Sequence, residues 1–182
     1  MIEHVPPLSP EDPDPWAIVR HFTATGYVVN AARTRMLLVR HRKLGFWLPP
    51  GGHLDPNGLP HEAALREVLE ETGVHARLVS LGEPVLTSTG PGVSELPQPW
   101  VMLQQQIPAT DREPEHTHLD LCYLLEADDQ VAPLAQDTEV SAAQWWDRAA
   151  IDREADVADE VRSFARTHLT WLQAITLLDV AG

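Results

Sequence analysis

Three glutamates, Glu67, Glu70 and Glu71, are spaced so that a helix would place them on one face. Like charges at these spacings repel each other, and Arg66 is the only lysine or arginine between Lys43 and Arg77. Clustered carboxylate oxygens are the ligands that Mg²⁺ and Mn²⁺ prefer. This face is therefore a candidate metal site, and the alternative is an acidic helix surface that only contacts water.

The glutamates need a helix and a fixed loop to position them. Residues 59–72 are predicted to be helical, because Pro60 suits a first helical turn and Gly73 suits the stop after the last turn. Apolar residues recur along one side of this helix at Ala64, Leu65, Val68 and Leu69. Pro49, Pro50, Gly51 and Gly52 predict a rigid loop without regular structure at residues 45–52, just upstream.

The segment from Gly52 to Val74 resembles the Nudix box, written G-x5-E-x7-R-E-U-x-E-E-x-G-U, where U is aliphatic. Eight of the nine fixed positions match, and the exception is Gly58, which stands where the box has its first glutamate. The preceding run Trp47-Leu48-Pro49-Pro50-Gly51-Gly52 is similar to the lead-in of the same family. The chain is thus identified by resemblance as a Nudix protein.

This resemblance implies an α/β (α+β) fold, an α/β/α sandwich with a mixed β-sheet. It also implies hydrolysis of the diphosphate bond in a nucleoside diphosphate linked to another moiety. Such substrates include a nucleotide sugar such as ADP-ribose, a nucleoside di- or triphosphate and a dinucleotide polyphosphate. The alternative is a non-catalytic Nudix-like module that binds a nucleotide and regulates another process, and Gly58 is its best support.

The implied cofactor is Mg²⁺ or Mn²⁺, which offsets the charge of the diphosphate and activates a water molecule. By position in the box, the metal ligands would be Gly52, through its carbonyl, and Glu67, Glu70 and Glu71. Arg66 would orient the glutamates. Glu67 is also one candidate for the general base.

A second candidate constellation is His116, His118 and Asp120, which alternate in sequence and would share one face of a strand. Histidine binds metals and titrates near neutrality, so these side chains are candidates to ligate a cation or contact substrate. The alternative is the exposed polar side of a half-buried strand.

Basic residues are few, and Arg40, Arg42 and Lys43 are grouped before the rigid loop. They are candidate phosphate contacts, and the alternative is an ordinary solvated hairpin. Glu139 is a second candidate general base, because the family often has an acidic loop at this place, although a plain surface role is the favoured alternative.

The remaining strands and helices are predicted from residue type and from the turn-forming residues between them. Strands are predicted at residues 22–29, 36–41, 74–81, 100–107, 119–125 and 142–146. A short helix is predicted near 16–21, and one long helix at 152–180. Trp47 and Trp100 are candidates to stack on a base or to be buried, and Cys122 is expected in the core.

Composition sets the outer limits. The chain has 182 residues, with 27 acidic against 13 basic residues and a net charge of −14. This balance excludes broad binding to a nucleic-acid backbone and disfavours an anionic membrane surface. One cysteine and no evident leader or apolar span predict a cytoplasmic protein. We expect a proline-rich arm at 1–15 and a single Nudix domain at 16–182. The resemblance leaves a homodimer open.

Overall fold

The computed structural model describes residues 19–82, 84–86, 89–110, 114–136 and 138–169. The proline-rich arm, the first half of the helix predicted near 16–21 and the end of the chain after 169 lie outside this range. Eight strands form one sheet: β1 Val19–Asn30, β2 Arg35–His41, β3 Trp47–Leu48, β4 Gly51–His53, β5 Ala76–Leu78, β6 Val101–Ile107, β7 His116–Ala127 and β8 Val140–Asp147. The helices are α1 Pro60–Thr72, α2 Arg148–Arg153 and α3 Asp159–Phe164, and a π-helical turn follows at Ala165–Leu169.

The centre of the sheet is a long parallel pair of strands. β1 and β7 run side by side in register from the pair Val19 and His116 to the pair Asn30 and Ala127. The neighbours of this pair, β2, β4, β5 and β6, run antiparallel to it. The sheet is therefore mixed, and the predicted fold class is confirmed.

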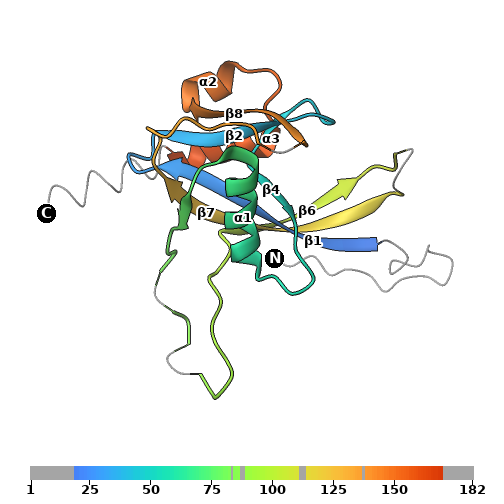
Figure 1. Ribbon diagram of the computed structural model, residues 1–182, viewed down its shortest axis with the longest axis vertical. Coiled ribbons are helices and arrows are strands. Elements are labelled where there is room, and N and C mark those ends of the chain that lie inside the picture. The colour runs from blue at the N-terminus through green and yellow to red at the C-terminus, as the bar shows by residue number, and fades with distance from the viewer. Residues whose placement is uncertain (1–18, 83, 87–88, 111–113, 137, 170–182) are drawn as a thin grey trace, which may run out of the picture.

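Helices cover both faces of the sheet, with α1 in front and α3 behind in Figure 1. Alternate residues along the strands point to opposite faces of the sheet, and each face packs into its own apolar cluster. Val28 and Leu37 pack with Val68 of α1, while Val29, Met36 and Leu38 pack with Val161 and Phe164 of α3. Each fully buried side chain of this kind stabilises the fold by about 1.5–3 kcal/mol.

Helix α1 has the bounds that its sequence predicts. It begins at Pro60, whose missing N–H is harmless in the first turn. It ends at Gly73, which has a left-handed φ of 67° and donates its N–H to the carbonyl of Leu69 at 2.8 Å. The helix is therefore fixed at both ends, and the glutamates on it have a defined orientation.

The predicted irregular loop at 45–52 contains two short strands, so that prediction was wrong in part. β3 pairs with β2, and β4 pairs with β1. The two prolines stand between the strands, at positions where no ladder hydrogen bond is required of them. The strand predicted at 74–81 is limited to Ala76–Leu78, and the strand predicted from 119 begins earlier, at His116.

The predictions for the two ends of the domain were also wrong in part. Residues 19–21 are strand rather than helix, because they pair with β7. The single helix predicted from 152 is divided into α2 and α3, since Trp47 donates its N–H to the carbonyl of Asp156 at 2.7 Å and forms a bridge with Val157. Asp147 caps α2 by accepting the N–H of Ala150 at 2.7 Å. Within the described range, no helix is long and apolar enough to cross a membrane.

Candidate metal and active site

Glu67 and Glu71, two of the three clustered glutamates on α1, converge on the glycines of β4. Glu71 is only 5% exposed, and its Oε2 accepts the N–H of Gly51 at 3.1 Å. Gly52 lies against Glu67 so closely that its lack of a Cβ is required by the contact. The rigid loop and the helix therefore meet at these carboxylates, as the shared helical face predicts.

Arg66 joins the third glutamate to this group. Its guanidinium lies 2.9 Å from Glu67 Oε1, 2.8 Å from Glu70 Oε2 and 3.4 Å from Asp55 Oδ2. It also donates to the carbonyl of His53 at 3.2 Å. Burial lowers the pKa of Arg66, but the surrounding carboxylates, Glu67 first, outweigh burial and raise it. Arg66 is therefore a fixed positive charge between Glu67 and Glu70.

The donor set around Gly52 suits a hard divalent cation. Glu67 lies at Gly52, Glu71 accepts from Gly51, and Glu70 is joined to Glu67 through Arg66. Carboxylate oxygens are the ligands that such an ion prefers. The bare backbone at Gly52 is the feature that lets the loop approach the carboxylate of Glu67. The residues present thus fit the metal that the family implies.

A carboxylate is present near the one position that departs from the Nudix box. Gly58 donates its N–H to the carbonyl of Asp55 at 3.0 Å, so the two residues close one turn. The carboxylate of Asp55 contacts Arg66. The loop therefore offers an acidic group to Arg66 although the expected glutamate is absent.

The structure divides the predicted triplet His116, His118 and Asp120. The three residues share a face of β7, as predicted, and Nε2 of His116 lies 3.1 Å from Nε2 of His118. Asp120 is buried and accepts hydrogen bonds from Thr23 at 3.0 Å and from Thr25 at 2.8 Å. Among the described residues, the hydrogen bonds of Asp120 thus come from hydroxyl groups of β1 and from the thiol of Cys122 rather than from the two histidines.

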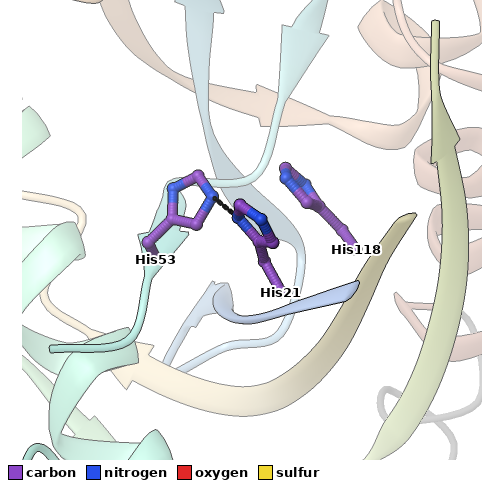
Figure 2. Close-up of side chains that lie close together, drawn as sticks. All are labelled: His21, His53 and His118. Atoms are coloured by element: carbon purple, nitrogen blue, oxygen red, sulfur yellow. Dashed lines mark hydrogen bonds between the residues drawn. The ribbon is translucent and has the colours of Figure 1, made fainter. Parts of the chain in front are cut away.

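His118 instead lies beside two histidines that the sequence analysis did not single out. Figure 2 shows the rings of His21, His53 and His118 facing one space, and they come from the adjacent strands β1, β4 and β7. Nδ1 of His21 lies 3.4 Å from Nε2 of His53, and one ring nitrogen from each of the three residues lies within 4.8 Å of the others. The alternation of His21, Thr23 and Thr25 on β1 was the available signal, but its partner strand was not readable from the sequence.

Cys122 is buried in the core, as expected. Its thiol donates to Oδ2 of Asp120 at 3.2 Å. Burial, together with the charge of Asp120, raises the pKa of the thiol far above its usual range. A thiol of this kind is a poor nucleophile.

The predicted phosphate contacts lie at the end of β2. Arg40 forms an ion pair with Asp156 at 2.9 Å, and alternation along β2 places it on the face that α3 covers. Arg42 donates its backbone N–H to the carbonyl of Glu139 at 2.8 Å. The side chain of Glu139 lies 4.0 Å from the ring of His41. Arg42, Lys43 and Glu139 thus form a group of charges at one loop.

The two tryptophans differ in their exposure. Trp47 is 5% exposed and packs edge to face on Trp146, with ring centres 4.9 Å apart. Trp100 is half-buried and packs against Phe164 and His168, with ring centres at 5.1 and 4.4 Å. Burial therefore accounts for Trp47, and Trp100 helps to hold the C-terminal helices to the sheet.

Two pockets in the described part of the chain lie apart from the glutamates. One, of about 350 Å³, is lined by Leu78–Gly82 and Glu95–Gln98, with Tyr123 at its wall. The other, of about 540 Å³, lies around Asn30 and His75. The chemistry of the glutamates, rather than the depth of a pocket, is what marks the candidate site.

The comparisons with known proteins agree with this fold. The sequence model of the NUDIX domain matches residues 20–168, and the chain belongs to this family. The predicted membership of the Nudix family is confirmed.

Solved structures and one curated relative are also similar to the chain. A hydrolase of the NUDIX family from Clostridium perfringens superposes with a TM-score of 0.66 at 24% identity, covering 85% of this chain and 99% of that chain. An Ap4A hydrolase from C. elegans gives a TM-score of 0.57 at 17% identity, covering 86% and 99%. These identities show a shared fold. A protein of Bacillus subtilis (strain 168) named "Putative 8-oxo-dGTP diphosphatase" is 48% identical over 51 residues, which span 28% of this chain and 34% of that relative.

Proposed function

We propose that this protein is a Mg²⁺- or Mn²⁺-dependent hydrolase that cleaves the diphosphate bond of a nucleoside diphosphate linked to another moiety. The observation that carries the proposal is the convergence of Glu67 and Glu71 on the backbone of Gly51 and Gly52. A glutamate face that only contacted water would not need a glycine pressed against it.

In this proposal, Glu67, Glu70, Glu71 and the carbonyl of Gly52 hold the cation. The cation, when bound, offsets the negative charge of the diphosphate and lowers the pKa of a bound water molecule. Arg66 is a positioning residue, because it fixes the carboxylates of Glu67 and Glu70 from one side. Asp55 fixes Arg66 in turn through its ion pair.

The general base has two candidates. Glu67 lies within the glutamate group, where a water molecule on the cation would be within its reach. Glu139 lies beside His41 and Arg42 at the start of β8. Replacing a base that lies outside the metal site leaves metal affinity intact. If Glu139 is the base, Glu139→Gln would therefore lower kcat without changing metal affinity. Glu67→Gln would lower kcat and metal affinity together.

The similarity to the Bacillus subtilis relative supports a nucleoside triphosphate as the first substrate to test. ADP-ribose and a dinucleotide polyphosphate follow, because they present the same diphosphate to the metal. We place Arg42 and Lys43 as contacts to the outer phosphates, since Arg40 is engaged by Asp156. His116 and His118 would flank the site from β7. A cytoplasmic location and a homodimer stay predictions.

A substrate panel with Mg²⁺ and with Mn²⁺ tests the proposal. Glu71→Gln and Glu67→Gln are expected to lower kcat by about 100-fold or more, because each replaces a charged carboxylate by a neutral amide of the same size. Glu62→Gln is the matched control, since Glu62 is exposed in the first turn of the same helix. Nucleotide binding without turnover of any compound would contradict the proposal and favour the non-catalytic module.

A further inference from the structure

We propose that His21, His53 and His118 form a second metal site, one that binds a borderline transition metal with Zn²⁺ as the best fit. Histidine nitrogens favour Zn²⁺ over Mg²⁺, whereas the carboxylates of α1 favour the harder ion. The chain would thus carry two donor sets of different chemistry, and the inference does not depend on the proposed hydrolase activity.

The spacing of the ring nitrogens matches a zinc centre. In a tetrahedral site with Zn–N bonds of 2.0–2.1 Å, two ligand nitrogens lie about 3.3–3.4 Å apart. Nδ1 of His21 and Nε2 of His53 lie 3.4 Å apart. The third nitrogen, from His118, lies within 4.8 Å of both. Water or a phosphate oxygen would complete the tetrahedron.

Three strands hold the histidines from rigid backbone. His21 and His118 are direct partners in the parallel ladder of β1 and β7. His53 belongs to β4 on the other side of β1, where it pairs with Thr23. The carbonyl of His53 also accepts a hydrogen bond from Arg66. A site built on paired strands loses little entropy when a metal binds.

A fourth histidine orients the third ligand. Nδ1 of His116 lies 2.9 Å from the carbonyl of Pro114, which can only accept, so Nδ1 carries the hydrogen and Nε2 carries the lone pair. Nε2 of His118, 3.1 Å away, must then be the donor. In this arrangement His118 donates an N–H to a neighbour, as ligating histidines typically do.

The three imidazole rings are held close together on the adjacent strands β4, β1 and β7. A shared cation makes this close approach of ring nitrogens favourable.

Zinc titration of the full chain, stripped with a chelator, tests the site. Calorimetry is expected to show one tight Zn²⁺ equivalent, and Co²⁺ in its place should give the visible absorption of a tetrahedral nitrogen site. His53→Ala and His118→Ala should each weaken Zn²⁺ binding at least about tenfold. His75→Ala, which removes an exposed histidine elsewhere, should leave it unchanged.

Glu71→Gln distinguishes this site from the glutamates. It should leave Zn²⁺ affinity and the Co²⁺ spectrum intact, whether or not the protein is a hydrolase. Equal Zn²⁺ affinity in the wild type and both histidine variants would overturn the inference. Loss of the Zn²⁺ equivalent in Glu71→Gln alone would also overturn it, because the ion would then occupy the glutamate group. His53 is exposed, so its replacement does not disturb the core.

Discussion

Gly52 lies directly against the carboxylate of Glu67: a Cβ atom at position 52 would lie 2.5 Å from Glu67 Oε1 and 2.7 Å from its Cδ. No real Cβ approaches another heavy atom so closely, so a side chain at this position would displace Glu67 or shift β4. The glycine is therefore part of the geometry of the glutamate group.

Replacing Gly52 should thus affect metal binding more than folding. Gly52→Ala is expected to weaken Mn²⁺ affinity about 10- to 100-fold, since it moves a ligand rather than removing one. The cost in the free energy of unfolding should be about 1–2 kcal/mol, because the end of a glutamate side chain can give way. Calorimetry measures the Mn²⁺ affinity, and urea unfolding measures the free energy of unfolding. Gly90→Ala is the control, because a Cβ there meets nothing within 4 Å, and unchanged Mn²⁺ affinity in Gly52→Ala would contradict the prediction.

Gly58 has room for the glutamate that the Nudix box carries. A Cβ at this position would make its nearest contact with Asp55 at 3.4 Å, an ordinary separation. Gly58→Glu is therefore expected to fold and to raise Mn²⁺ affinity or kcat several-fold, through an added carboxylate. Gly58→Gln separates charge from size. If Gly58→Glu and Gly58→Gln behave alike, position 58 has no part in the metal site.

The hydroxyl of Thr25 contributes to stability through Asp120. Thr25→Val keeps the shape of the side chain and removes a hydrogen bond to a buried carboxylate, which should cost about 1.5–3 kcal/mol in the free energy of unfolding. In an Asp120→Asn background the same substitution should cost less, because the charged acceptor is absent. Equal costs in the two backgrounds, measured by urea unfolding, would show that the hydrogen bond is not the source.

His168 should make stability depend on pH. Burial against Trp100 lowers its pKa below the usual value of 6.5. The folded state thus favours the neutral ring, and the unfolded chain takes up the proton first as pH falls. The contribution is complete above pH 6.5 and is lost as pH falls from there towards the lowered pKa. It should amount to at most about 1 kcal/mol, because the ring is partly exposed.

Urea midpoints at pH 7.5 and pH 5.5 measure this dependence. The fall in midpoint on acidification should be smaller in His168→Gln than in the wild type, since glutamine does not titrate. His75→Gln, at an exposed position, should fall as the wild type does. A fall of the same size in His168→Gln would assign the pH dependence to other groups.

Local patterns in the sequence predict the glutamate group well. Helix α1 is bounded by Pro60 and Gly73, and the spacing of Glu67, Glu70 and Glu71 fixes their common face without reference to the rest of the fold. The box itself depends on residues within one continuous stretch. The prediction of this helix succeeds because the residues that define it are close together in the sequence.

Contacts between distant segments explain the failures. His21 lies beside His118, and Thr23 beside Asp120, only because β1 and β7 pair in parallel. No local sequence pattern predicts that pairing. In the same way, the hydrogen bond from Trp47 to Asp156 interrupts the long C-terminal helix that periodicity favours. A tertiary partner overrides local propensity in both places.

The parallel pairing also governs the order in which the molecule can be assembled during synthesis. Thr23 and Asp120 are 97 positions apart, and the whole β1 and β7 ladder keeps this offset. When β1 leaves the ribosome, β2 and β4 follow soon after, but one side of β1 has no strand to pair with until β7 emerges. A chain stalled or cleaved within that interval carries an uncovered sheet edge, which is the kind of surface that recruits chaperones or aggregates.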